Sequence, residues 1–269
     1  MIVKKISLDN INNSINSTEK LIITIGAFDG LHLGHQRLLE ELKNAKEKDK
    51  TFKTAVLTFE NHPDFYLNKR DDRLIIANNK TKYAKFSACD IDYCFLLDKE
   101  ILLLTYQEFH SKILDKLNVN KIYVGSEFCY GKNALGNVYT LMEKYNVKTF
   151  LIKKENGKKI SSSDILLLLE KGDIIEANKL LGYNYTIDVI SYDILSLTYG
   201  NKIIKCILDN CIIPLGMYQS KLLINDVVEK NYCINIDYDN SINKYYFNIK
   251  IENNINELDK LKIEIIKKI

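Results

Sequence analysis

The first two thirds of this chain alternate between short apolar runs and segments with helical spacing. Strands are expected at residues 21–26, 52–59, 93–97, 121–125 and 148–153. Helices are expected at residues 34–50, 80–88, 106–117, 138–145, 163–170 and 173–181. This alternation predicts an α/β fold, a parallel sheet with helices on both faces, which binds ligands at the carboxyl ends of its strands.

The pattern changes after Gly182, a residue type that commonly ends helices. Short strands with polar breaks are expected at residues 185–196, 202–208, 217–224, 232–237 and 244–251, which is typical of a small antiparallel barrel or sandwich. A final amphipathic helix is expected from about residue 255 to the C-terminus. We therefore predict two domains, residues 1–182 and residues 183–269.

Charge and cysteine content exclude several classes of function. The 38 Lys and Arg residues nearly balance the 35 Asp and Glu residues, which argues against nucleic acid as a partner. None of the six cysteines forms a Cys-x-x-Cys pair, so a zinc site is not expected. No apolar run is long enough for a signal peptide or a membrane span. We expect a cytoplasmic protein that acts on small molecules and has no membrane partner.

The strongest chemical signal is the string GAFDGLHLGH at residues 26–35, between an expected strand and an expected helix. Glycines allow close approach of a nucleotide to the backbone, and a helix N-terminus offers amide donors for phosphate. His32 and His35 can donate hydrogen bonds to charge that develops on a transferred phosphate. The string therefore favours attack at a nucleotide phosphate over a glycine-rich turn with incidental histidines.

This string resembles the HxGH signature of the nucleotidyltransferase superfamily. Its longer form, GAFDGLHLGHQRLL, is similar to the prokaryotic FAD synthetase family, the FMN adenylyltransferase module of bifunctional riboflavin kinase/FAD synthetases. Three more strings resemble that family's motifs in order: FENHP at 59–63 for F-D-P-H-P, VGSEFCYG at 124–131 for V-G-x-[DN]-F-x-F-G, and KISSSDIL at 159–166 for [RK]-x-S-S-[ST]-x-I-R. The resemblance covers about residues 1–185.

The resemblance implies a Rossmann-like nucleotidyltransferase domain that transfers AMP from ATP to FMN, with Mg²⁺, giving FAD and pyrophosphate. It implies His32, His35 and Glu127 as catalytic residues, with Glu127 also the metal ligand. The residues implied for ATP and phosphate binding are Gly26, Phe28, Asp29, Gly30, Gly34, Lys159, Ser161, Ser162 and Ser163. The residues implied for the flavin and nucleotide pocket are Phe59, His62, Pro63, Gly125, Phe128 and Tyr130.

Several motif positions allow a simpler interpretation. Ser161 and Asp164 could form a capping box, which is compatible with phosphate binding because both use the same exposed amides. The loop at residues 124–131 could be an ordinary turn at the end of a strand. It is not a P-loop, because its glycine spacing is one residue too long and Asn133 replaces the Ser or Thr after Lys132.

The first domain also departs from the family pattern. Leu166 stands where the serine motif ends in arginine, which removes a phosphate contact worth about 2–4 kcal/mol. Glu127 stands for Asp or Asn, Asn61 for a proline, and Ala134 for an arginine after the flavin loop. These changes motivate a second hypothesis, a non-catalytic or regulatory flavin- or nucleotide-binding protein. A third is transfer to another phosphorylated acceptor, since HxGH alone does not select the acceptor.

The second domain resembles the riboflavin kinase barrel in strand count and position. Residues 213–218 (IPLGMY) are similar to its P-x-G-V-Y segment. However, the only two prolines are Pro63 and Pro214, so the Pro-Thr pair of the kinase nucleotide motif is absent from the chain. The acidic string at residues 237–239 suggests a metal loop but lacks the rest of a calcium hand. We predict a degenerate barrel that has lost kinase chemistry.

Overall fold

The computed structural model describes residues 1–11, 19–67, 75–151, 159–198, 201–209, 211–251 and 259–269. The chain divides into two compact units, Met1–Ile160 and Ser161–Ile269. None of the helices in the described ranges combines the length and apolar character that a membrane span requires.

The first unit is built on a six-stranded sheet whose neighbouring strands are all parallel. Its strands are β1 (Ile2–Ile6), β2 (Lys20–Ile25), β3 (Phe52–Phe59), β4 (Tyr93–Leu97), β5 (Val119–Gly125) and β8 (Val147–Phe150). They lie in the order β1-β4-β3-β2-β5-β8. The chain builds outward from β2 through β3 and β4 and then returns to the other side of β2 with β5. The switch point of the sheet is therefore between β2 and β5, where such folds bind ligands.

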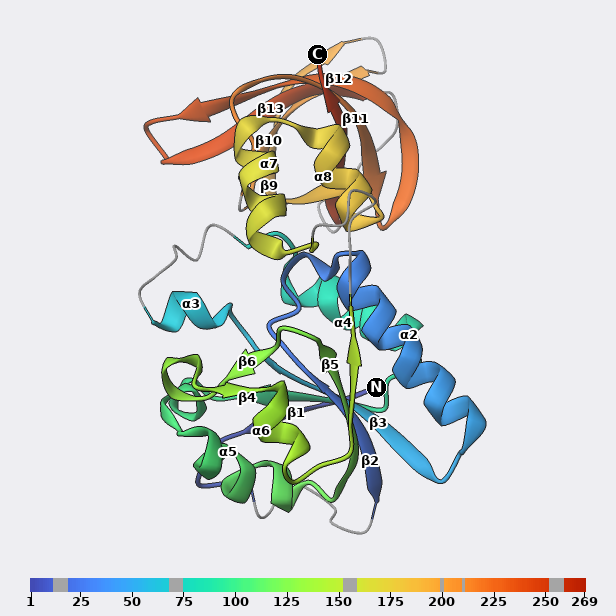
Figure 1. The fold of residues 1–269 in the computed structure, drawn as a ribbon. Helices are drawn as coiled ribbons and strands as arrows, with labels where there is room; N and C mark the ends of the chain where they lie inside the picture. Colours follow the sequence, from blue (N-terminus) through green and yellow to red (C-terminus); the bar gives the residue numbers. More distant parts are fainter. Residues whose placement is uncertain (12–18, 68–74, 152–158, 199–200, 210, 252–258) are drawn as a thin grey trace. The chain divides into compact units, whose positions relative to one another are not determined.

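Helices cover both faces of this sheet (Figure 1). The helices are α2 (Leu33–Lys48), α3 (Pro63–Tyr66), α4 (Asn79–Ala88), α5 (Tyr106–Lys112) and α6 (Val138–Met142). The 3₁₀ turns are η1 (Asp29–Leu31), η2 (Lys99–Leu103), η3 (Leu114–Lys116) and η4 (Lys132–Ala134), and a short hairpin pairs β6 (Cys129–Tyr130) with β7 (Gly136–Asn137).

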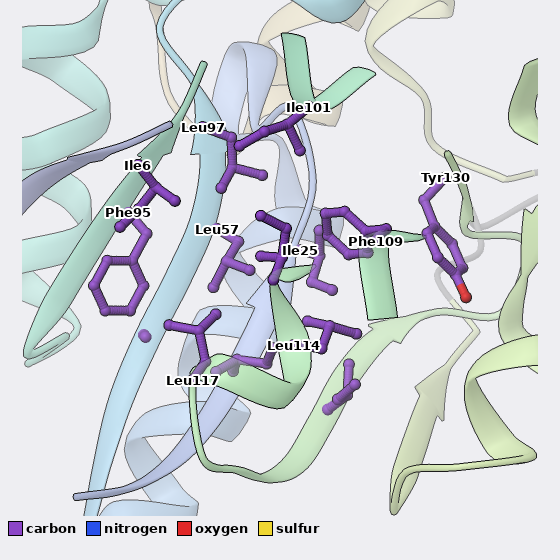
Figure 2. Packing of buried hydrophobic residues seen from close by; sticks show 14 of the residues in the cluster. Ile6, Ile25, Leu57, Phe95, Leu97, Ile101, Phe109, Leu114, Leu117 and Tyr130 are labelled. Atoms are coloured by element: carbon purple, nitrogen blue, oxygen red, sulfur yellow. The ribbon is translucent and has the colours of Figure 1, made fainter. Parts of the chain in front are cut away.

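Alternate residues of each strand face opposite cores, as the geometry of a strand requires. On β3, Val56 packs with α2 and α4, whereas Ala55 and Leu57 pack with α5 and α6. Figure 2 shows the second of these cores, with Leu57 at its centre and Phe109 of α5 beside it. The predicted parallel sheet with helices on both faces is confirmed. Strand β1 was not expected, because at the sheet edge it pairs only with β4 and its sequence is half polar. Residues 152 and 153 of the last expected strand lie outside the described residues.

The second unit is a closed six-stranded antiparallel barrel preceded by two helices (Figure 1). The helices are α7 (Ser162–Lys171) and α8 (Ile174–Leu181). The barrel strands are β9 (Tyr185–Thr198), β10 (Asn201–Leu208), β11 (Gly216–Ile224), β12 (Val227–Asp239), β13 (Lys244–Ile251) and β14 (Leu261–Lys268), in the order β10-β13-β12-β11-β14-β9. The interior is filled by large apolar side chains, including those of Tyr185, Tyr218 and Phe247. The predicted antiparallel barrel is confirmed.

The predicted C-terminal helix is wrong. Residues 261–268 form strand β14, which pairs with β11 on one side and β9 on the other and so closes the barrel. Leu261, Ile263 and Ile265 are buried alternately, with a period of two. The apolar spacing of this short segment also fits a helix, and only the two neighbouring strands decide between the two.

The compact units divide between Ile160 and Ser161, before α7, and the predicted domains, residues 1–182 and 183–269, stay a prediction. Helix α8 packs on β14 and β9. The Asn178 side-chain amide donates to the Ile265 carbonyl oxygen at 2.9 Å, and its own oxygen accepts from the Tyr185 N–H at 2.8 Å. These bonds tie the helix to the barrel. The predicted extent of the nucleotidyltransferase domain, residues 1–182, stays a prediction about function.

Candidate functional site

The GAFDGLHLGH string forms the turn between β2 and α2, at the carboxyl end of β2. Its first glycine, Gly26, donates its N–H to the Leu57 carbonyl oxygen of β3 at 3.1 Å. Gly30 has a positive φ of 71°, and a Cβ there would lie 3.1 Å from the Ile76 side chain. The positive φ therefore favours glycine at position 30, and a Cβ there would also crowd the Ile76 side chain.

Two residues of this string have structural roles that the sequence did not indicate. The Phe28 side chain is fully buried and packs edge-on against Phe86 of α4, with ring centroids 5.5 Å apart. Asp29 is also buried, and its Oδ1 accepts hydrogen bonds from the Ile76 and Ala77 N–H groups at 2.9 and 3.5 Å. Phe28 is therefore a core residue, while Asp29 fixes the turn to the segment that precedes α4.

The two histidines of the string are stacked at the N-terminus of α2. Their ring centroids are 3.8 Å apart, with 18° between the planes. His32 caps the helix, because its Nδ1 accepts the His35 backbone N–H at 3.4 Å. That bond leaves the proton of a neutral His32 ring on Nε2, so the ring presents an N–H donor. Gly34, which lies between the two histidines in the sequence, is buried in the first turn of α2.

Both histidine rings are held neutral at pH 7. Burial, with a smaller contribution from the Lys159 charge, lowers the pKa of His32 to about 4. Burial also lowers the pKa of His35, and positive charge on His32, Lys82 and His62 lowers it further. The His35 Nδ1 is buried without a hydrogen-bond partner among the described residues. A site of this kind can offer directed hydrogen bonds to an anion, and a bound anion would favour protonation.

A buried lysine that the sequence analysis missed lies in the same region. Lys82 of α4 is 3% exposed, and its Nζ donates a long hydrogen bond of 3.5 Å to the Glu60 carbonyl oxygen at the end of β3. Burial lowers the pKa of Lys82, whereas the Asp29 carboxylate raises it. The sequence contains little sign of this burial, because α4 has no clear apolar stripe; the one hint is that Lys82 stands one turn before the buried Phe86.

The FENHP turn follows β3 directly. Pro63 is the first residue of α3, and His62 caps this short helix by accepting the Asp64 N–H on Nδ1 at 3.2 Å. The charge of His62 contributes to the lowered pKa of His35, which places the two rings within electrostatic reach of each other. Phe59, predicted to line the pocket, packs mainly in the core on the α5 and α6 face.

The VGSEFCYG loop leaves the sheet at the carboxyl end of β5, beside β2. No atom lies within 4 Å of the position that a Cβ on Gly125 would occupy, so there is open space next to the backbone here. Glu127 forms an exposed ion pair with Lys159, with Nζ and Oε2 3.0 Å apart. Phe128 is half-buried, and Tyr130 is buried. Because Lys159 also lowers the pKa of His32, the ion pair and the histidines belong to one region of the first unit.

The serine motif lies at the start of α7 in the second unit. The Ser161 hydroxyl oxygen accepts the Asp164 N–H at 3.2 Å and caps the helix. Ser162 and Ser163 form the first turn of α7, and Leu166 lies in the next turn. This bond is one of the two that a capping box of Ser161 and Asp164 would contain, and it is compatible with phosphate binding at the same helix start. A phosphate-binding role for the three serines stays a prediction.

The described residues contain no group of three or more His, Cys, Asp or Glu side chains arranged to hold a metal ion. Glu127 is a single exposed carboxylate with Lys159 on one of its oxygens. This donor set fits Mg²⁺ that is held mainly by substrate phosphates with one carboxylate from the protein. It does not fit a cation bound by protein groups alone.

Comparisons with known proteins agree with these observations. The FAD synthetase family model matches residues 14–164. The chain is 35% identical over 190 residues to a bifunctional riboflavin kinase/FMN adenylyltransferase of Buchnera aphidicola, covering 67% of this chain and 59% of that protein. It is 32% identical over 230 residues to a protein of the same description from Bacillus subtilis, covering 81% and 72%. The chain thus matches about three fifths of the first relative's length.

One solved structure shares the fold along the whole chain. It is described as a macrolide-efflux protein from Streptococcus pneumoniae, with a TM-score of 0.79 and 22% identity, and the match covers 100% of this chain and 91% of that one.

Proposed function

Because the chain belongs to the FAD synthetase family, we propose that it transfers the AMP part of ATP to FMN, giving FAD and pyrophosphate. In this reaction a phosphate oxygen of FMN attacks the α-phosphorus of ATP. The bond from the α-phosphorus to the oxygen that bridges to the β-phosphate breaks, and that oxygen leaves with pyrophosphate. Positioning and electrostatic stabilisation account for catalysis, and no covalent enzyme intermediate forms.

The observation that carries the proposal is the stacked His32–His35 pair at the N-terminus of α2. A neutral ring with its proton on Nε2 can donate a hydrogen bond to a phosphate oxygen whose charge grows in the transition state. Lys159 and Lys82 add positive charge near the pair, because the first lowers the pKa of His32 and the second that of His35. The amides at the start of α2 and the open space at Gly125 leave room for a nucleotide at the switch point of the sheet.

Glu127 is the carboxylate that would hold Mg²⁺ bound to the ATP phosphates. When bound, the ion would supply positive charge that stabilises the leaving pyrophosphate. Lys159 already occupies one oxygen of Glu127, so it would keep the carboxylate oriented until the substrate arrives.

We further propose that the barrel has no riboflavin kinase activity. No Pro-Thr pair exists in the chain. The acidic string at residues 237–239 does not provide a free metal loop, because Asp239 accepts from the Lys205 ammonium at 2.6 Å and from the Ser241 hydroxyl at 2.5 Å. Pro214 acts structurally, its carbonyl oxygen accepting the Tyr218 hydroxyl at 2.7 Å.

One assay tests these proposals. The purified chain is incubated with ATP and Mg²⁺ plus either FMN or riboflavin, and the flavins are separated by chromatography. FAD from FMN, with no FMN from riboflavin, is the expected result. Absence of FAD at every protein concentration would favour a non-catalytic flavin- or nucleotide-binding protein, and activity only with another phosphorylated acceptor would favour a different transferase. FMN formed from riboflavin would refute the loss of kinase chemistry.

A pair of variants locates the activity. His35→Asn should lower the rate of FAD formation about 10²- to 10³-fold, the usual effect of losing one transition-state donor. Arg37→Gln is the matched control, because Arg37 lies on the same helix with an exposed side chain and, among the described residues, pairs with Glu40 and Glu41 of that helix. An equal loss in both variants would show that the histidine pair is not the site.

A further inference from the structure

A buried hydrogen-bonded network links Tyr130 of the VGSEFCYG loop to α5 and α6, and the proposed phosphate chemistry does not use it. His110 of α5 is 7% exposed, and its Nε2 lies 2.5 Å from the Tyr130 hydroxyl. The same hydroxyl lies 3.0 Å from Oγ1 of Thr140 in α6. The family motif quoted above has phenylalanine where this chain has Tyr130, so the hydroxyl is a departure from that pattern.

The donor and acceptor of each bond in this hydrogen-bonded network can be assigned by starting from Thr140. Thr140 Oγ1 donates to the Asn137 carbonyl oxygen at 2.8 Å and accepts the Asn137 N–H at 2.9 Å. Its one proton is thereby used, so Tyr130 donates to Thr140, and His110 donates its Nε2–H to Tyr130. Three elements, α5, the β6–β7 hairpin and α6, are joined through one phenol.

The surroundings keep His110 neutral and the phenol in place. Burial and the Lys144 charge lower the pKa of His110, while Asp115 and Glu143 oppose them. The ring also lies edge-on to Tyr145, with centroids 5.1 Å apart. Figure 2 shows Tyr130 at the edge of the hydrophobic core, next to Phe109.

Tyr130 in turn packs against the ring of Phe128, which lies two residues earlier in the same loop and is half-buried. The rings of Phe128 and Tyr130 are nearly parallel, 6° apart in plane and 5.5 Å between centroids. Opposite Tyr130 on β7 is Gly136, where a Cβ would lie 2.8 Å from Cζ of the tyrosine ring. The β6–β7 hairpin thus packs closely on the Tyr130 ring, and the Tyr130 ring supports the ring of Phe128.

We propose that His110, Tyr130 and Thr140 form a positioning clamp that holds Phe128 for contact with the isoalloxazine ring of the flavin. This inference rests on the proposed function, since it assigns Phe128 a flavin partner. The three clamp residues do not touch the substrate. Their effect is to keep one aromatic wall of the flavin site preorganised before the flavin arrives.

The test separates flavin binding from nucleotide binding. Tyr130→Phe and His110→Leu, singly and together, are compared with the unmodified full chain. Binding of FMN is followed by flavin fluorescence, and binding of ATP by calorimetry. Each single substitution should weaken FMN binding about three- to tenfold, the net value of a buried hydrogen bond, and leave ATP binding unchanged within about twofold. The FMN affinity of the double variant should be no lower than that of the weaker-binding single variant, because both substitutions break the same hydrogen-bonded network.

Tyr139→Phe is the matched control. Tyr139 is 78% exposed on the same helix as Thr140, so loss of its hydroxyl should change neither affinity. Thermal unfolding of every variant checks folding, and Tyr130→Phe, which keeps the ring, remains informative if His110→Leu does not fold. If these variants bind FMN as well as the unmodified chain, or lose FMN and ATP affinity equally, the clamp is refuted and the proposed function still stands. Lack of FMN binding by the unmodified chain would overturn both the clamp and the proposed function.

Discussion

Two glycine-to-alanine substitutions in the same part of the first unit should have opposite consequences. Gly125 ends β5 with no atom within 4 Å of a new Cβ and with no positive φ. Gly136 lies in β7, where a new Cβ would be 2.8 Å from both the Tyr106 Cβ and the Tyr130 Cζ. The space beside the first position is therefore open, and the second position is closed by packed tyrosine side chains.

These distances set the expected magnitudes. Gly125→Ala should leave the free energy of unfolding unchanged or raise it by about 0.4–1 kcal/mol, because alanine reduces the freedom of the unfolded chain. Gly136→Ala should lower it by about 1–3 kcal/mol, the usual cost of overpacking. A ligand that approaches the backbone at Gly125 meets the new methyl group, so binding of ATP, of FMN, or of both should weaken by about 1–3 kcal/mol, or about five- to 150-fold.

Thermal unfolding of both variants, together with ATP and FMN affinities of Gly125→Ala, measures these effects. A loss of 1 kcal/mol in a unit of this size corresponds to about 2–4 °C in melting temperature. The reasoning would be refuted by a Gly125→Ala protein that melts as early as Gly136→Ala, since the space would then not be open. It would also be refuted by a stable Gly125→Ala protein with unchanged affinity for both ligands, since no ligand would then pass beside Gly125.

Three further predictions concern charge. Lys82→Met should raise the pKa of His35 in an NMR titration, because the Lys82 charge lowers it, whereas Lys82→Arg should keep it low. The free energy of unfolding should fall as the pH drops from 6.5 toward about 4, because His32 binds a proton in the unfolded chain but not in the folded protein. The lowered pKa of His32 corresponds to a loss of about 3 kcal/mol. Denaturant unfolding measured across this pH range should therefore show a flatter pH dependence for His32→Asn. Leu166→Arg should raise the rate of FAD formation by restoring the family's phosphate contact; an unchanged or lower rate would mean that another residue already supplies it.

The elements that could be predicted are those whose pattern is strong within one segment. The strands at β3 and β4 and the helices α2 and α4 follow from apolar periodicity, and the turn at GAFDGLHLGH follows from glycines and a helix start. Strand β14 was missed because its apolar spacing suits either period, and hydrogen bonds to β11 and β9 decide the outcome. Strand β1 was missed because an edge strand buries little.

By itself, the sequence determined the family and suggested the proposed chemistry, through histidines at a helix start, a glycine at the end of β5, a lone carboxylate in the loop after it and the lack of a Pro-Thr pair. The tertiary structure decided what each side chain does. Phe28 and Phe59 are core residues, Lys82 is a buried charge near the histidines, and Tyr130 carries a hydrogen-bonded chain. The physical reason is that periodicity records which residues avoid water, whereas burial, pKa and hydrogen-bond partners depend on segments that are distant in sequence and meet only in the fold.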